Sequence, residues 1–276
     1  MKLFSRLPWN KEKESIQITQ QEKRKILVIS WGGFRWTYAL WILKAIEEKN
    51  IDKEIDAIYW VSIWAVIWST RSSWMKAERI FEVLKKISIQ DFYWNDILKK
   101  SGWFVSNKKI QKMIQQYLPK SFDNLQVPFY AWAVDTNKAE YHLFNSWDLQ
   151  TIVLWSMSIP GIFPPVKYEE YSLVDWGVLN NFPVDIAKQH YPDHEVIWIA
   201  LNKFQTNQKI RSAFDNLQIT FEVMRRSKLL ENTRLVDYLF YRELPISVLS
   251  LNKSQMQKAF DLGYKDWYEM FWKTNS

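Results

Sequence analysis

Two consecutive strand–turn–helix units constrain the fold more than any other feature of this sequence. Residues 25–30 form a short apolar run rich in β-branched residues, which is typical of a parallel strand buried on both faces. A tight loop follows, and residues 37–49 then carry apolar side chains at helical spacing. The pattern repeats with a strand at 55–59, a turn at 60–64 and a helix from Ala65. Two such units in succession predict an α/β fold with a parallel sheet.

The glycine and tryptophan contents are both unusual. The 276 residues include 6 glycines and 17 tryptophans, whereas a soluble domain carries about 7% glycine, which corresponds here to about 19 residues. The excess of tryptophan is therefore about as large as the deficit of glycine. Several tryptophans also stand where a small or turn-forming residue is expected, namely Trp36, Trp41, Trp68, Trp147 and Trp176.

The turn after the second strand has the spacing of a nucleophile elbow, G-x-S-x-G. Its sequence is Trp60-Val-Ser-Ile-Trp64, with tryptophan at both glycine positions. In such an elbow the serine occupies a strained turn, and its neighbours are small because backbone segments pass close by. The loop Trp31-Gly-Gly-Phe-Arg-Trp36 shows the same conflict, because bulky side chains block the approach of an anion to its peptide N–H groups.

One hypothesis explains these tryptophans together: the sequence was translated with UGA as tryptophan, whereas the organism reads UGA as glycine. Glycine then gives Gly-Gly-Gly-Phe-Arg-Gly at 31–36, Gly-Val-Ser-Ile-Gly at 60–64 and Asp-Gly-Gly at 175–177. Three interrupted motifs become complete. Three further tryptophans stand in contexts that suit either residue: Trp103, Trp267 and Trp272.

With these glycines the chain resembles the patatin-like phospholipases over about residues 25–200. The glycine-rich loop and the serine elbow are followed by a third block, which runs from Ser156-Met-Ser-Ile-Pro-Gly to Leu173-Val-Asp-Trp-Gly-Val. The three blocks occur in the order and approximate spacing of that family. The resemblance implies a three-layer α/β/α fold with a mostly parallel central sheet.

The resemblance also implies a catalytic dyad, with Ser62 as nucleophile and Asp175 as its base. A carboxylate that takes the serine proton itself needs direct contact and a sheltered site. Asp175 follows the apolar segment 171–174, and Ser62 follows the strand at 55–59. Both residues are thus expected at the carboxyl ends of strands, where open α/β sheets place their sites.

The loop at 31–36 is the oxyanion hole that the resemblance implies. Backbone N–H groups of Gly32 and Gly33, with Trp31 at a glycine position and Phe34 beside them, would stabilise the tetrahedral oxyanion. Arg35 resembles the loop arginine of the family and is expected to order this loop or to bind a phosphate. The implied substrate is a phospholipid or another acyl-ester lipid, which is hydrolysed through an acyl-enzyme without a metal or organic cofactor.

Two other functions fit the same fold. The first is a catalytically silent lipid-binding or scaffold protein, which tryptophan at positions 31, 60, 64 and 176 would favour. The second is an acyltransferase, which shares the acyl-enzyme and differs in the group that accepts the acyl chain. A dinucleotide-binding loop at 31–36 is disfavoured, because the strand at 55–59 leads directly into the serine turn and does not end in an acid.

Simpler interpretations apply to other polar residues. Ser62 and Asp175 could each be turn residues, since Asp-Gly is a common turn pair, although the three ordered blocks argue against this. His190 and His194 have metal-like spacing, but Pro192 interrupts any helix between them, and we expect a surface loop.

Two acids and one basic helix also have structural explanations. Asp135 is expected to stabilise a turn after the strand at 128–134, and Asp185 to begin a helix. The helix at 221–230 carries Arg225 and Arg226, and we expect its apolar residues to pack on the core rather than on a membrane.

The chain divides into three parts by composition. Residues 1–24 are a polar leader, 25–200 the catalytic domain, and 201–276 a mainly helical C-terminal extension that packs on the same domain. Helices at 76–87 and 107–118 form an insertion (76–118), which is expected to cover the site as a lid. The expected strands lie at 25–30, 55–59, 128–134, 171–174, 195–201 and 245–249.

The bulk composition limits location and partners. The chain lacks cysteine, which excludes disulfides and thiolate chemistry, and its apolar segments are too short for a bilayer span or a signal peptide. We therefore expect a cytoplasmic protein. The net charge of +7 favours peripheral contact with an anionic membrane. We expect no nucleic-acid partner, because the lysines are spread along the chain.

Overall fold

The computed structural model describes residues 23–30, 35–60, 75–85, 107–156, 158, 160, 164–175, 177, 180–201, 210, 216, 219–220, 223–224, 226–241, 244 and 253–272. The strands are β1 (Lys25–Ile29), β2 (Ile55–Trp60), β3 (Phe129–Asp135), β4 (Glu140–Phe144), β5 (Val166–Tyr168), β6 (Tyr171–Asp175), β7 (Glu195–Ala200) and β8 (Tyr238–Tyr241). The helices are α1 (Trp36–Glu48), α3 (Ala77–Lys85), α5 (Asn107–Tyr117), α6 (Leu149–Ser156), α7 (Val184–His190), α9 (Arg226–Thr233) and α10 (Lys253–Trp272), with 3₁₀ turns at Ile51–Glu54 and Phe122–Asn124.

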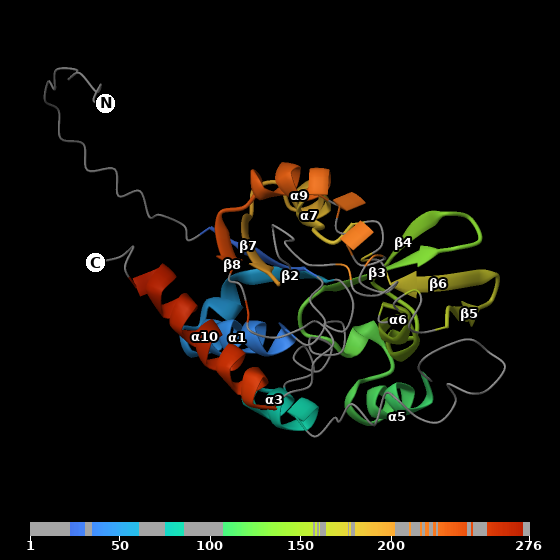
Figure 1. Cartoon of the computed structure of the whole chain (residues 1–276), viewed down its shortest axis with the longest axis horizontal. Coiled ribbons are helices and arrows are strands. Elements are labelled where there is room, and N and C mark those ends of the chain that lie inside the picture. The colour runs from blue at the N-terminus through green and yellow to red at the C-terminus, as the bar shows by residue number, and fades with distance from the viewer. Residues whose placement is uncertain are drawn as a thin grey trace, which may run out of the picture.

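The described strands form one eight-stranded sheet in the order β5-β6-β3-β2-β1-β7-β8, with β4 also paired to β3. β1, β2, β3, β7 and β8 pair with one another in parallel. β4 and β6 pair with β3, and β5 pairs with β6, in antiparallel fashion. Figure 1 shows the parallel strands at the centre and the antiparallel group at one side. The expected α/β class with a mostly parallel central sheet is confirmed.

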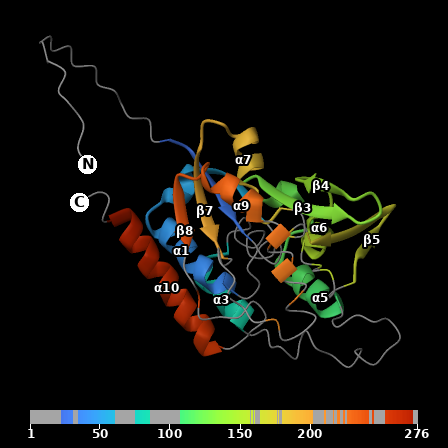
Figure 2. The same ribbon diagram turned by 45° about the horizontal axis from the view of Figure 1, so that its top comes forward.

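Two hydrophobic cores lie on the two faces of the sheet. Leu27 and Ile29 of β1 belong to the larger core, and the alternate residues Ile26 and Val28 belong to the smaller one. The larger core includes buried residues of α1, α3, α5, α6 and α10, whereas α7 and α9 contribute to the smaller core. The result is a three-layer α/β/α arrangement (Figures 1 and 2).

The long helix α10 packs against α1 at very short range. A Cβ atom on Gly263 would lie 2.1 Å from the carbonyl oxygen of Tyr38, so only glycine fits this crossing. Next to this contact, the Tyr38 hydroxyl donates to Asp266 Oδ2 at 2.7 Å. The ring of Trp41 lies 4.4 Å from that of Phe260. The C-terminal helix is thus fixed to the first helix of the sheet layers.

Gly263→Ala should therefore lower the free energy of unfolding by about 2 to 3 kcal/mol, because the added methyl group forces α10 away from α1. The sign of the change is informative, since helix propensity alone would make the substitution stabilising by up to about 1 kcal/mol. Urea denaturation measures the difference, and Lys258→Ala, at an exposed position of the same helix, is the control. A stabilised Gly263→Ala protein would contradict the close crossing.

Several elements differ from those that the sequence predicts. The expected strands near 25–30, 55–59, 128–134, 171–174 and 195–201 are β1, β2, β3, β6 and β7. The expectation that helical crossovers make all of these strands parallel is wrong for β6, which runs antiparallel to β3. The two-residue turn between β5 and β6 makes these two strands antiparallel to each other, whereas the direction of β6 in the sheet is set by its pairing with β3.

Strands β4, β5 and β8 were not predicted. β4 and β5 are short and largely exposed or half-buried, so they lack the continuous apolar run that marks the central strands. The strand expected at 245–249 lies outside the described residues. In the described part of the chain, no helix combines the length and apolar character that crossing a membrane requires.

Candidate active site

Strand β3 brings the ends of two other strands together. β4 pairs with residues 131–135 of β3 along one edge. Trp60 of β2 is the partner of Ala131, and Asp175 of β6 is the partner of Ala133. Because a strand has only two edges, β2 and β6 must share the edge opposite β4. β2 and β6 run in opposite directions along this edge of β3. Their carboxyl ends therefore face each other, separated by two residues of β3.

The separation of these two ends follows from strand geometry. Two residues of a strand span about 6.6 Å, so the backbones of Trp60 and Asp175 lie at about that distance along the edge of β3. The side chain of Asp175 lies on the same face of the sheet as that of Leu173, which belongs to the core that includes α1 and α6. The chain therefore leaves β2 beside the strand end that carries Asp175.

Asp175 is held in a sheltered and oriented position. Its residue is 2% exposed. The carboxylate Oδ1 accepts a hydrogen bond from the backbone N–H of Gly177 at 2.8 Å. The backbone N–H of Asp175 donates to the carbonyl of Ser158 at 3.0 Å, and the Ser158 hydroxyl donates to Leu154 of α6 at 3.0 Å. Strand β6 is thus tied to the end of α6 at the residue that carries the carboxylate.

The loop after β1 starts beside the carboxyl end of β2. Ile29, the last residue of β1, is the partner of both Trp60 and Ile199. The backbone N–H of Ser30 donates to the carbonyl of Ile199 at 3.1 Å, and its hydroxyl accepts from the backbone N–H of Leu201 at 2.9 Å. The chain therefore enters the loop from a position bonded to β7.

Arg35 closes the other end of this loop. It is 5% exposed, and its Nη1 donates to the carbonyl oxygen of Leu201 at 2.9 Å. Both ends of the loop are consequently bonded to the segment that leaves β7. Arg35 thus ties the start of α1 to the segment after β7. Serines 30 and 158, which support the site, were not singled out in the sequence, because an isolated buried serine has no distinctive pattern.

The structure describes part of the expected site. Trp36 is the first residue of α1, is 1% exposed, and packs edge-on against Phe81 with ring centroids 6.1 Å apart. Trp60 ends β2, and Gly177 donates to Asp175 as described above. The remaining expected site residues lie outside the described part of the chain: Trp31, Gly32, Gly33, Phe34, Ser62, Trp64 and Trp176.

Two further acids have the structural roles expected for them. Asp135 is fully buried, and its Oδ1 accepts from the backbone N–H groups of Asn137 at 3.0 Å and Ser172 at 3.1 Å. It stabilises the turn after β3 and also ties β6 to β3. Asp185 lies in the first turn of α7 and forms an ion pair of 2.7 Å with Lys228. Both expectations are confirmed.

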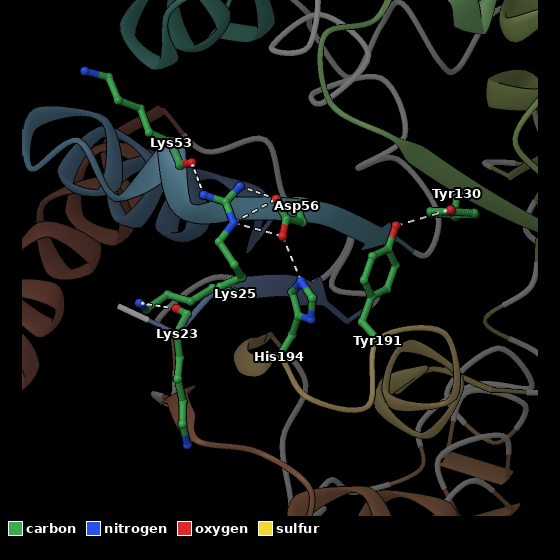
Figure 3. A network of polar contacts seen from close by, with 8 residues as sticks. Lys23, Lys25, Lys53, Asp56, Tyr130, Tyr191 and His194 are labelled. Carbon is green, nitrogen blue, oxygen red and sulfur yellow. Dashed lines mark hydrogen bonds and ion pairs between the residues drawn. The ribbon is translucent and has the colours of Figure 1, made fainter. Parts of the chain in front are cut away.

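The two closely spaced histidines bond to different residues of β2, His194 to Asp56 and His190 to Tyr59. Figure 3 shows His194 Nε2 bonded to Asp56 Oδ2 at 2.7 Å, with the Arg24 guanidinium on the same carboxylate. His190 is the last residue of α7, and its Nδ1 is hydrogen-bonded to the Tyr59 hydroxyl at 2.8 Å. His190 ends α7 rather than lying in a loop, but it is exposed, and the turn at 191–194 separates it from His194 as expected. Among the described residues, no cluster of three or more potential ligands could hold a metal.

The Asp56 network predicts a loss of stability in acid. Hydrogen bonds from Arg24, and secondarily from His194, hold the pKa of Asp56 at about 2, against partial burial, which acts to raise it. A depressed carboxylate pKa stabilises the fold above pH of about 4, and this contribution disappears as the pH falls through about 2. Because the Arg24 side chain is 50% exposed, we expect only about 1 kcal/mol.

Urea denaturation of wild type and Asp56→Asn at a series of pH values measures this contribution. The two proteins should differ by about 1 kcal/mol at neutral pH and should converge as the pH approaches 2. A difference that stays constant over the whole range would show that the carboxylate charge is not the cause.

The fold and the edge geometry together define a class of protein. It is a three-layer α/β/α protein in which the end of β2 and the buried Asp175 at the end of β6 meet at one edge of β3. A family model described as patatin-like phospholipase matches residues 27–188, which is more than half of the chain. The chain belongs to the patatin-like phospholipase family.

Individual relatives agree with this assignment. The probable lipid hydrolase 463L of Invertebrate iridescent virus 6 is 27% identical over 188 residues, which cover 60% of this chain and 64% of the viral protein. Patatin-like phospholipase domain-containing protein 6 of Homo sapiens is 26% identical over 172 residues, which cover 59% of this chain and 12% of the human protein. The match thus spans less than two thirds of the length of either relative.

A solved structure shows the same fold at low sequence identity. The crystal structure of VipD from Legionella pneumophila matches with a TM-score of 0.57 and 13% identity. The alignment covers 90% of this chain and 66% of the VipD chain. At this identity the likeness concerns the fold.

Proposed function

We propose that this protein is a serine lipid acyl hydrolase in which Ser62 is the nucleophile and Asp175 is its base. The observation that carries the proposal is the meeting of β2 and β6 on one edge of β3. Ser62 follows Trp60 by two residues, which limits the separation of their Cα atoms to about 7 Å. The serine is therefore confined to the neighbourhood of the strand end that carries the buried Asp175.

The chemistry proceeds in two halves that use the same carboxylate. In the first half, Asp175 takes the proton of the Ser62 hydroxyl while the oxygen attacks the ester carbonyl. The tetrahedral intermediate collapses to an acyl-enzyme, and the proton passes to the departing alcohol. In the second half, a water molecule gives a proton to Asp175 and attacks the acyl group, and the proton then returns to Ser62 as the fatty acid leaves.

Burial and hydrogen bonding suit Asp175 to this role. A general base needs a fixed position within reach of the proton that it accepts. The bond from the Gly177 N–H and the tie between β6 and Ser158 restrict movement of the carboxylate. An Asp-Gly-Gly sequence at 175–177 would let the chain turn tightly around the carboxylate without a bulky side chain beside it.

The oxyanion of the intermediate would be stabilised by backbone N–H groups of residues 31–33. Such donors act because they are already oriented when charge develops on the carbonyl oxygen. The bonds of Ser30 and Arg35 to the end of β7 support this orientation, since they fix the chain on both sides of the loop.

We further propose that glycine occupies the UGA-encoded positions of the native protein. Trp147 supports this, because its φ of 83° lies in the region where a bulky side chain is strained and glycine is not. The same residue is 49% exposed, and its ring lies 5.6 Å from that of Phe144 and 6.1 Å from that of Tyr168. Glycine at 60, 64 and 176 would likewise remove indoles from the places where the serine turn and Asp175 must approach each other.

The relatives' names support an acyl-ester lipid as the substrate. The test is to express the glycine form of the chain and to measure release of fatty acid from phospholipid and of chromophore from a short-chain ester. Ser62→Ala provides the inactive comparison. Turnover of both substrates that depends on Ser62 supports the proposal, and a folded glycine form without activity on either substrate contradicts it.

A further inference from the structure

Helix α9 has an inner face that is bonded to the chain segment downstream of Asp175. Leu229 and Asn232 are 6% and 1% exposed. The side-chain amide of Asn232 donates to the carbonyl of Phe182 and, at 3.1 Å, to Asp185 Oδ1. These partners lie seven and ten residues after Asp175 in the sequence. The position of α9 is therefore coupled to the part of the chain that leaves the proposed catalytic aspartate.

α9 and the helical residues 223–224 just before it expose apolar side chains that have no cover in the described structure. Val223 and Leu230 are 63% and 60% exposed, and Met224, beside Val223, is 65% exposed. The expectation that the apolar residues of this helix pack on the core is thus correct for Leu229 and wrong for Val223 and Leu230. A single exposed apolar residue is ordinary, but here several occur on one short helical segment.

Two arginines continue the same stripe. Arg226 and Leu230 lie in α9, whereas Val223 precedes the helix and Arg234 lies in the turn after it. The four residues recur at the three- and four-residue spacing that places side chains on one side of a helix. Arg226 and Arg234 are exposed and form no ion pair with another residue of the described chain. Glu231, an acid on the neighbouring side, contacts Lys228 at 4.0 Å. We call Val223, Arg226, Leu230 and Arg234 the outer stripe.

Alternation of leucine or valine with unpaired arginine fits an anionic lipid surface. The apolar side chains can enter the boundary between head groups and acyl chains, while the arginines remain at the level of the phosphates. The net charge of +7 acts in the same direction. A protein partner would need a larger continuous apolar area than this narrow stripe provides.

We propose that the outer stripe of α9 docks this protein on an anionic phospholipid surface. Figure 1 shows α9 beside α7, on the face of the sheet opposite α1 and α10. Docking itself is independent of catalysis, and only its consequence, access of membrane lipid to the site, rests on the proposed function.

The test is co-sedimentation of the Ser62→Ala protein with vesicles, which measures binding without hydrolysis. Vesicles of phosphatidylcholine alone are compared with vesicles that also contain phosphatidylglycerol. The parent protein should prefer the anionic vesicles. Arg226→Gln/Arg234→Gln should weaken binding to them by about 10- to 30-fold, since each basic residue at an anionic surface contributes a factor of about five. Leu230→Ser should also weaken it.

Lys112→Gln/Lys258→Gln is the matched control, because it removes the same charge from exposed positions on α5 and α10. This control should change the affinity by less than about threefold. Equal loss of binding in both double variants would overturn the proposal, as would a parent protein that ignores the anionic lipid. A dimer that Leu230→Ser converts to a monomer would assign the stripe to a second copy and also overturn it.

Soluble-ester turnover separates this proposal from the catalytic one. In the background with Ser62 intact, the stripe variants should hydrolyse a soluble short-chain ester at the parent rate, which also shows that they fold. Vesicle hydrolysis should fall in parallel with binding. Binding without turnover of any ester would refute the hydrolase function and leave the docking surface intact.

Discussion

Asp175→Asn should lower kcat for ester hydrolysis by about 10³- to 10⁴-fold, with the protein still folded. The amide keeps an oxygen that can accept the hydrogen bond from Gly177, so the local geometry survives. It cannot take the proton of Ser62, however, and in a dyad no other side chain is positioned to do so. A general base typically contributes a factor of about 10² to 10⁴, and here it serves both halves of the reaction.

The measurement is the steady-state rate with a soluble ester, compared with circular dichroism of the same samples. Asp193→Asn is the matched control, since it makes the same change at an exposed position in the turn after α7. It should retain the parent rate. If Asp175→Asn kept more than about a tenth of the activity, the carboxylate would not be the base.

The second large effect concerns the tryptophans of the three motifs. A protein with glycine at positions 31, 60, 64 and 176 should hydrolyse esters at least about 10³-fold faster than one with tryptophan there. Loss of one oxyanion donor costs on the order of 10²-fold or more, and an indole at either side of Ser62 would also distort the turn that presents it. Comparison of kcat for the two proteins measures this difference.

Trp147→Gly, introduced alone into the tryptophan form, controls for the change of residue itself. Position 147 precedes α6 and is exposed. Relief of its positive φ should raise the free energy of unfolding by about 1 kcal/mol without restoring activity. Equal activity of the glycine and tryptophan forms would contradict the glycine assignment, and a destabilised Trp147→Gly protein would contradict its structural support.

The sequence predicts the parallel half of the fold well because that half is repetitive and deeply buried. β1, β3 and β7 are mainly apolar runs, and in β2 Asp56 is the one charged residue. Asp175 could also be placed at a strand end from its motif. The direction of β6 could not, because it depends on a pairing with β3 that involves residues about forty positions apart.

The hydrogen bonds of Ser30 and Ser158 that support the site could not be predicted from the sequence either. Ser30 accepts a hydrogen bond from the distant Leu201 N–H, and Ser158 donates to the Leu154 carbonyl four residues before it, and neither contact leaves a distinctive sequence pattern. For a related reason, the sequence does not predict that Leu230 is exposed while the adjacent Leu229 is buried. Adjacent leucines on a helix look alike in a periodicity argument, and only packing decides which one is covered.

The central claim is that Ser62 is a nucleophile activated by Asp175. Its most direct test is labelling of the glycine-form protein with a fluorophosphonate, followed by peptide mapping by mass spectrometry. We predict a single adduct on the peptide that contains Ser62, formed rapidly in the parent protein and lost in Asp175→Asn. An active protein that carries its label on another residue, or whose Ser62 reacts equally fast without Asp175, would contradict the account.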